Sequence, residues 1–359
     1  MAAVVRRARH AFGFLLVTFS TLACSDPTLT DREQAQVIDG ALARLRETYF
    51  ETGDIPTIET AIRGRVAQGA YRTLTQPEAF ANQLQDDFRA ASKDPHFRVI
   101  YVPGDMPRLP TSMKRPPEAE ADRSARVHLE AVLYNNGFAR VQRLEGNVGI
   151  LELTNLPDGE NMVEKAAAAM TFLADTSALI LDLRANGGGD LSGVDVVLSY
   201  FVEGRIHTYD MLAKKAEDNL QYFTDARVLG PRYAAEKPVF VLTSRRTFSA
   251  GEAMVDAMRT WRRARVIGER TRGGSNAALP TKATDHFIVG IPFMKTVNVA
   301  TGKNWNVVGV EPDLAVSADK AQDTAYGFAL EAIVSSTKIP AEREQAQALL
   351  QRLKAKPQG

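Results

Sequence analysis

Cysteine is nearly absent from this sequence, and so is any imbalance of charge. One cysteine allows no internal disulfide, and with only five scattered histidines it excludes a zinc site built from Cys/His clusters. The formal net charge of +1 gives no electrostatic basis for binding nucleic acid. Beyond the N-terminus, no apolar run is long enough to cross a membrane. What remains is an ordinary globular composition, 45% hydrophobic and 24% charged, with 359 residues for about two domains.

Residues 1–23 are predicted to be an export signal. Three arginines precede the apolar stretch AFGFLLVTFSTLA, which is too short for a comfortable membrane-spanning helix and ends in small residues. Cys24 follows this stretch and resembles the lipobox cysteine of bacterial lipoproteins, although Thr21 stands where leucine is usual. Two interpretations stay open: lipidation of Cys24, and simple cleavage of a secretion signal. Both predict an exported, periplasmic protein, and the first adds a lipid anchor in a bacterial membrane.

Residues 28–92 are predicted to form a small N-terminal helical domain. Thr30 and Glu33 have the spacing of a capping box. The apolar residues that follow fall on one helical face, namely Val37, Ile38, Ala41, Leu42 and Leu45. Residues 93–129 are then predicted to be a strand, HFRVIYV, followed by a proline-rich flap or linker.

From residue 130 to residue 340, apolar strands alternate with helices, which predicts a layered α/β domain. The segment SALILDLR is apolar almost throughout, as expected of a strand covered on both faces. KPVFVLTS predicts another strand, and AGEAMVDAMRTWRR predicts the helix after it. HFIVGIPF and KTVNVA are predicted as two further strands. Residues 341–359 are predicted to be a C-terminal helix and tail.

Two strand-to-helix loops carry the residues with chemical potential. DLRANGGGD has three consecutive glycines, and Ser249 lies just ahead of a predicted helix. Both loops should lie at the carboxyl edge of a parallel sheet, so a hydroxyl and free backbone amides are expected to converge there. A nucleophile beside an oxyanion hole suits acyl transfer. Each loop alone also has a structural interpretation, since Ser249 can cap the helix and the glycines can form a turn.

Four segments carry a family resemblance: LILDLRANGGGD, VLTSRRTFSAGEA, VIGERTRGG and TGKNWNVVGVEPDLAV. In order and spacing they resemble the tail-specific (C-terminal processing) serine proteases, over about residues 130–325. The branch they resemble is that of interphotoreceptor retinoid-binding protein and the tricorn protease core. The resemblance implies a crotonase/ClpP-like layered α/β catalytic domain preceded by a small N-terminal helical domain. It implies peptide or unfolded protein substrates, and no metal or organic cofactor.

The resemblance assigns roles to individual residues. Ser249 corresponds to the family nucleophile, and the amides of Ala250 and Gly188 are expected to form the oxyanion hole. The glycines expected to bind substrate are Gly187, Gly189, Gly273 and Gly274. Relatives of the processing type use a lysine as base in the loop that reads GERTRGG here, and this loop has no lysine. An arginine cannot replace it, because a guanidinium does not deprotonate.

His96 is the expected base. It stands where the tricorn-like branch has a histidine, and histidine accepts a proton near neutral pH. The alternative is that His96 only packs at a domain boundary. Asn306 stands where relatives often have a glutamate, so it is expected to orient the imidazole without supplying a charge. Glu252 is expected to help order its loop.

Peptide hydrolysis is the predicted function, and two others stay open. One is a non-catalytic carrier of an apolar, retinoid-like ligand on the same fold. The other is a crotonase-like acyl-thioester enzyme, which would not need Ser249. About fifty residues separate His96 from Val148, too few for the PDZ domain of the processing proteases. The sequence carries no signal for an oligomeric state.

Overall fold

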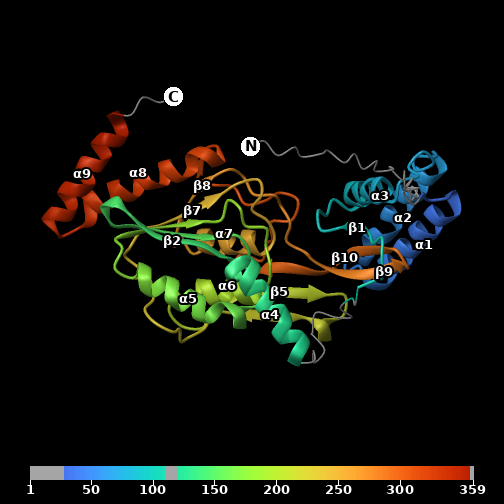
Figure 1. The fold of residues 1–359 in the computed structure, drawn as a ribbon, viewed down its shortest axis with the longest axis horizontal. Helices are drawn as coiled ribbons and strands as arrows, with labels where there is room; N and C mark the ends of the chain where they lie inside the picture. Colours follow the sequence, from blue (N-terminus) through green and yellow to red (C-terminus); the bar gives the residue numbers. More distant parts are fainter. Residues whose placement is uncertain (1–27, 108, 110–119, 356–359) are drawn as a thin grey trace, which may run out of the picture.

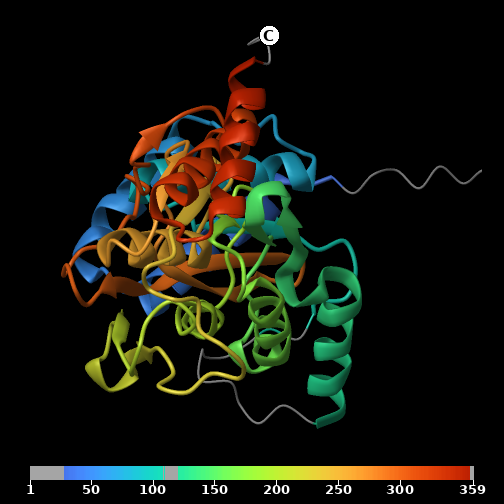
Figure 2. The same ribbon diagram turned by 90° about the vertical axis from the view of Figure 1, so that its left-hand side faces the viewer.

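The computed structural model describes residues 28–107, 109 and 120–355. The predicted signal, Cys24 and most of the proline-rich flap lie outside these residues. Figure 1 shows a helical domain at one end of the molecule, a layered α/β region in the middle, and two C-terminal helices at the other end. Figure 2 shows how the C-terminal helices lie along one side of the layered region. None of the helices in the described ranges is long and apolar enough to span a bilayer.

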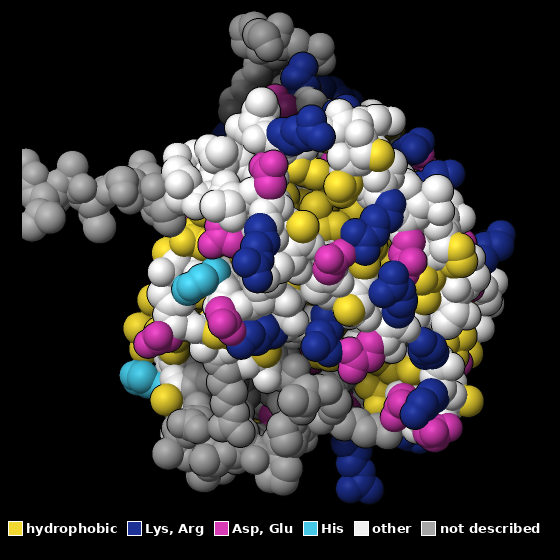
Figure 3. Space-filling model, turned by 90° about the vertical axis from the view of Figure 1, so that its right-hand side faces the viewer, with side chains coloured by type: hydrophobic (Ala, Val, Ile, Leu, Met, Phe, Trp, Pro, Cys, Tyr) yellow, Lys and Arg dark blue, Asp and Glu magenta, His cyan; other side chains and the backbone are white. Residues whose placement is uncertain are grey.

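The N-terminal domain packs three helices, which are α1 (Asp31–Thr48), α2 (Ile55–Ala67) and α3 (Pro77–Ser92). The predicted capping box is present: the Glu33 amide donates to the Thr30 hydroxyl at 3.3 Å, and the Thr30 amide donates to the Glu33 carboxylate at 2.8 Å. All five residues predicted for the apolar face of α1 are buried. The exposed face of this end of the molecule carries interspersed acidic and basic side chains over its described part (Figure 3).

An antiparallel sheet joins the helical domain to the rest of the molecule. Its strands are β1 (Arg98–Tyr101), β5 (His207–Ala213), β6 (Leu220–Phe223), β9 (Ala277–Thr284) and β10 (Phe287–Asn298). The order is β1-β10-β5-β6, with β9 also paired to β10. The two strands predicted within residues 286–300 are one continuous strand, β10. Its first half pairs with β1 and its last residues pair with β5, so it belongs to both regions.

The helical domain is not self-contained, because β10 completes its core. Phe287, Val289 and Ile291 are buried in the same apolar cluster as the three helices. The phenyl rings of Phe80 and Phe287 meet edge to face, with centroids 5.9 Å apart. The helical domain is therefore held in a defined position on the layered region.

A second sheet forms the centre of the layered region. Its strands are β2 (Phe138–Leu144), β3 (Val148–Leu153), β4 (Ala178–Asp182), β7 (Val239–Thr243), β8 (Arg265–Gly268) and β11 (Leu314–Ala315). The order is β11-β8-β7-β4-β3-β2, and every pair is parallel except β2 with β3. Its helices are α5 (Gly159–Leu173), α6 (Leu191–Leu198), α7 (Ala250–Thr260), α8 (Ala318–Ser336) and α9 (Pro340–Ala355).

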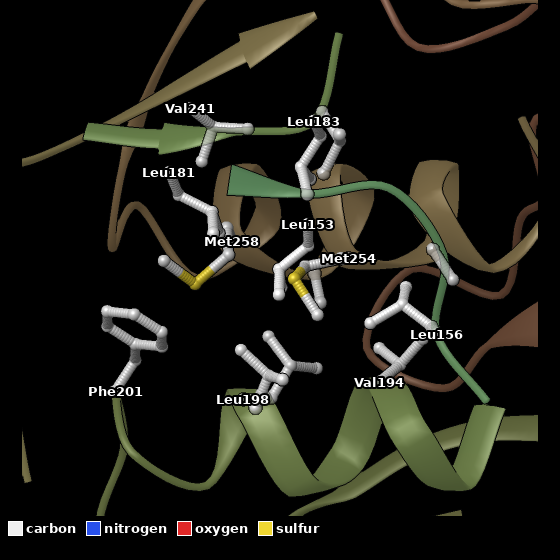
Figure 4. Packing of buried hydrophobic residues seen from close by; sticks show 14 of the residues in the cluster. Leu153, Leu156, Leu181, Leu183, Val194, Leu198, Phe201, Val241, Met254 and Met258 are labelled. Carbon is white, nitrogen blue, oxygen red and sulfur yellow. The ribbon is translucent and has the colours of Figure 1, made fainter. Parts of the chain in front are cut away.

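Helices cover both faces of this sheet, which explains its continuous apolar strands. Leu179 and Leu181 of β4 pack in the cluster that contains α5, α6 and α7. Ala178 and Ile180 of the same strand pack against α8 and α9. Figure 4 shows the first cluster, in which the Met254 and Met258 side chains of α7 lie between the strands and α6. Every residue of β4 and β7 is buried, as the sequence predicts.

The predicted linker contains a helix that the sequence analysis missed, α4 (Glu120–Tyr134). The segment follows a proline-rich stretch and is rich in charge, so its composition indicated a loop. The sequence analysis also did not predict the strands β5, β6 and β9 of the antiparallel sheet.

A buried carboxyl group on α6 predicts a pH dependence of stability. The Asp195 carboxyl accepts a hydrogen bond from the Thr208 hydroxyl at 2.8 Å, and burial raises its pKa to about 7. Between the ordinary pKa of an aspartate and about pH 7, the folded protein therefore keeps a proton on Asp195 that the unfolded chain has released. This contribution is complete below the unfolded pKa and is lost as the pH rises through about 7.

Replacing Asp195 with asparagine keeps an acceptor for Thr208 and removes the titration. We expect the wild-type free energy of unfolding to fall between pH 5 and pH 8 by roughly 2 kcal/mol more than that of Asp195→Asn. Chemical denaturation at the two pH values measures this difference. Parallel pH dependences in the two proteins would contradict the expectation.

Candidate active site

The glycine loop and the serine loop meet at the carboxyl ends of β4 and β7, which are neighbouring parallel strands. Three hydrogen bonds tie the loops together. The Phe248 amide donates to the Asn186 carbonyl at 3.1 Å, the Thr247 hydroxyl to the Leu183 carbonyl at 2.9 Å, and the Ser244 hydroxyl to the Arg184 carbonyl at 2.6 Å. The predicted convergence of the two loops is therefore present in the structure.

Ser249 occupies a strained turn at the start of α7. Its backbone has φ 54° and ψ −121°, a region that favours glycine and costs about 1–3 kcal/mol for other residues. The turn places Ser249 in the wall of a pocket. The N-terminus of α7 adds a partial positive charge next to it.

Glu252 connects this turn to the loop of residues 271–274. Its fully buried carboxylate accepts four hydrogen bonds. The donors are the Ser249 amide (2.9 Å), the Thr271 hydroxyl (2.5 Å), the Gly273 amide (2.7 Å) and the Gly274 amide (2.8 Å). Burial raises the pKa of Glu252, and these donors oppose that effect. Glu252 thus orders the loop, as expected. Because Glu252 holds the Gly273 and Gly274 amides, the structure does not favour their predicted role as donors to substrate.

The three consecutive glycines differ in what their amides do. The Gly187 amide donates to the Thr154 carbonyl at 3.0 Å, and the Gly188 amide donates to Oδ1 of Asn186 at 2.9 Å. Within the described part of the chain, no hydrogen bond engages the Gly189 amide or the Ala250 amide. The Gly188 amide was predicted to serve the oxyanion hole, and its bond to Asn186 argues against that role. The available pair is Gly189 and Ala250.

Gly188 has a steric role instead. Its φ of 106° favours glycine, and a Cβ there would lie 2.7 Å from Cβ of Ser249. A side chain at this position would therefore push the two loops apart.

His96 reaches the same pocket from the helical domain, in the segment between α3 and β1. Its ring packs on Phe248, with centroids 4.6 Å apart. A Cβ on Gly274 would lie 2.7 Å from Cε1 of His96, so this glycine makes room for the imidazole. Both ring nitrogens are buried without a hydrogen-bond partner, so His96 and Ser249 line the same pocket without a hydrogen bond between them.

The carboxylate beside His96 is Asp94, a residue that the sequence analysis did not single out. Oδ1 of Asp94 accepts the His96 amide at 2.8 Å and lies 3.4 Å from Nδ1 of the ring. Oδ2 of Asp94 accepts a hydrogen bond from Nδ2 of Asn276 at 2.7 Å. Asn306, the predicted orienting residue, accepts the Ser275 amide at 3.2 Å and makes no hydrogen bond to His96. The structure thus argues for Asp94 in the role predicted for Asn306.

The pocket that these loops form has a volume of about 340 Å³. Ser249, Ala250, Gly189 and His96 all line it. A potential nucleophile, a potential base and two amides without internal partners therefore share one cavity.

Comparison with known proteins identifies the family. Residues 147–316 match the family described as Peptidase family S41. Residues 28–131 match the domain described as the N-terminal domain of peptidase S41 in eukaryotic IRBP. Residues 147–316 are therefore a peptidase family S41 domain, preceded by an N-terminal domain of the type found in eukaryotic IRBP. The predicted resemblance to tail-specific proteases of the IRBP-like branch is confirmed.

Individual relatives are distant. The carboxy-terminal processing protease CtpB of Bacillus subtilis is 23% identical over 230 residues, which are 63% of this chain and 46% of that protein. The chain spans less than half the length of the curated relatives it matches.

Two solved structures share the fold. A lipoprotein from Streptococcus agalactiae has a TM-score of 0.52 at 12% identity and covers 83% of this chain and 96% of its own. Mature CPAF has a TM-score of 0.50 at 12% identity and covers 89% and 97%. The predicted layered α/β domain behind an N-terminal helical domain is confirmed.

Proposed function

We propose that this protein is an exported serine peptidase that cleaves peptide bonds through an acyl-enzyme on Ser249. The observation that supports this most directly is the shared pocket of Ser249, His96 and the free amides of Ala250 and Gly189. The proposed substrates are peptides or unfolded protein segments, whose backbone carbonyls are accessible to a pocket of this kind.

The reaction follows from these groups. Oγ of Ser249 attacks the peptide carbonyl carbon while His96 takes the hydroxyl proton. The negative charge on the carbonyl oxygen is stabilised by the amides of Ala250 and Gly189 and by the N-terminus of α7. His96 then gives its proton to the leaving amine as the C–N bond breaks. Water, deprotonated by His96, hydrolyses the ester and frees Ser249.

His96 must approach Ser249 for this reaction, since no hydrogen bond joins them. Unliganded sites are often loose and tighten when substrate binds. The imidazole nitrogens have no other partner among the described residues, so nothing competes for them. Asp94, at 3.4 Å from Nδ1, positions the ring and stabilises its positive charge when the proton arrives. It is a positioning residue, because it acts through His96.

The carrier alternative finds less support in the pocket. An apolar ligand needs an apolar wall, and this wall includes Arg98, Asp190 and His96. Apolar residues such as Leu191, Met211 and Trp305 also line the pocket, so its wall is mixed, but a retinoid-like molecule would desolvate the charged groups without pairing them.

Labelling with a fluorophosphonate probe tests the nucleophile. We expect wild-type protein to be labelled, Ser249→Ala to show no labelling, and His96→Gln to react at least about 100-fold more slowly, since a general base contributes this much. Mass spectrometry of the labelled peptide should place the adduct on Ser249. A folded wild-type protein that the probe does not label would contradict the proposed function.

Asp94 and Asn306 can be compared directly. Asp94→Asn keeps an acceptor for the His96 amide and removes the charge, so the fluorophosphonate rate should fall by about 100-fold. Asn306→Ala, the matched control, should stay within a few-fold of wild type. Circular dichroism and thermal unfolding show whether each variant is folded. The opposite order of the two rates would return the positioning role to Asn306.

Export and anchoring are proposed from the N-terminal sequence. Cleavage ahead of Cys24 and its lipidation would hold the enzyme at a bacterial membrane. In a bacterial host, wild-type protein should fractionate with membranes, and Cys24→Ser should be released into the soluble fraction. A cysteine variant that stays with the membrane would rule out this anchor.

A further inference from the structure

Arg98 lines the pocket, and no residue in the described part of the chain forms an ion pair with it. We propose that Arg98 binds a carboxylate of the substrate close to the bond that Ser249 attacks, so that the enzyme selects peptides with a carboxylate at this position. The inference deepens the proposed function and rests on it. The carboxylate can belong to an Asp or Glu side chain or to the C-terminus of the peptide, and the experiment below distinguishes the two.

The strand β1 directs Arg98 away from the helical domain. Val99 is buried in the core of that domain, and Tyr101 packs against it, so alternation along the strand puts Arg98 on the opposite face. Arg98 lies opposite Gly290 of β10, where a Cβ would come within 3.1 Å of Cβ of Arg98. The glycine leaves space for the arginine, and Arg98 lines the same pocket as Ser249.

The guanidinium is fixed on one side and free on the other. Its Nη1 donates to the carbonyls of Pro95 and Phe97, at 2.8 and 3.3 Å. These carbonyls flank His96, so Arg98 is held in register with the proposed base. Among the described residues, none forms a hydrogen bond with Nε or Nη2 of Arg98. Neither nitrogen is among the buried atoms that lack a partner. Two donors of the planar fork therefore have no hydrogen-bond partner among the described residues, and such a fork matches a carboxylate.

The charges around Arg98 favour an anion. Among the described residues Arg98 forms no ion pair, and burial followed by the charge of Arg272 lowers its pKa. Arg272 lies with its guanidinium 4.9 Å from the ring centroid of Phe248, on which His96 also packs. Asp190 lines the pocket too, but its Oδ1 accepts the Ser192 amide and hydroxyl, and it makes no ion pair with Arg98. A partly desolvated cation without a counter-ion is stabilised when a carboxylate arrives.

Binding to a protein that cannot turn over tests the proposal without relying on catalysis. Four versions of one alanine-rich decapeptide, with Glu or Gln in the middle and a free or amidated C-terminus, are titrated into Ser249→Ala protein. The fluorescence of Trp305, which lines the pocket, reports binding. We expect the peptide with a matching carboxylate to bind at least about tenfold more tightly than its neutral version, as one charge-assisted pair allows.

Adding Arg98→Gln to the same protein should reduce this ratio to less than about twofold, and Arg98→Lys should keep part of it. Arg72→Gln, which removes an exposed arginine elsewhere in the helical domain, should leave the ratio unchanged. If replacing Glu with Gln weakens binding, the recognised group is a side-chain carboxylate. If amidation weakens binding, the recognised group is the C-terminus.

The two proposals fail in different ways. Equal affinity for all four peptides, or a preference that survives Arg98→Gln, would overturn the role of Arg98 whatever the fluorophosphonate result. A preference that depends on Arg98 in a protein whose Ser249 is not labelled would confirm the carboxylate site and remove the peptidase.

Discussion

The arrangement of the site depends on the hydrogen bonds of Asn186. It is fully buried, and its Nδ2 donates to the Leu153 carbonyl while its Oδ1 accepts the Gly188 amide. Its own carbonyl accepts the Phe248 amide. One residue, through its side chain and its backbone carbonyl, thus connects the end of β3, the glycine loop and the serine loop. Because Oδ1 holds the middle glycine, the amide left without an acceptor is that of the next residue, Gly189.

A second buried group does the same for the other wall of the site. Glu252 joins the start of α7 to the loop of residues 271–274, and the next residues of this loop reach the helical domain. Asn276 bonds to Asp94, and Gly274 gives space to His96. The proposed base comes from a segment about 150 residues before the nucleophile. Its position therefore depends on tertiary contacts of this loop and on β10, which belongs to both cores.

Features set by local pattern could be predicted from the sequence, and features set by tertiary contacts could not. The capping box at Thr30, the apolar strand β4 and the convergence of the Ser249 and glycine loops follow from short-range spacing and strand direction. The choice of Gly189 over Gly188 depends on which amide Asn186 binds, and a run of identical residues cannot reveal that. Asp94 was missed because an acidic residue two positions from a histidine is common. Only the folded structure shows that this carboxylate is buried beside the His96 ring.

The polar groups around the pocket divide into two sets. The amides of Gly187, Gly188, Gly273 and Gly274 all have acceptors inside the protein. Among the described groups that have no acceptor or donor inside the protein are the amides of Gly189 and Ala250, the His96 ring nitrogens, and Nε and Nη2 of Arg98. Of these groups the His96 nitrogens are buried, and an unpaired buried polar group destabilises the native state by about 1–3 kcal/mol. The strained turn at Ser249 adds a cost of the same order at the same place. A ligand that offers an oxygen to the amides and a carboxylate to the guanidinium would pair these groups, while the Ser249 hydroxyl supplies the proton that the imidazole accepts. A peptide carrying a carboxylate, attacked by Ser249, meets each of these conditions.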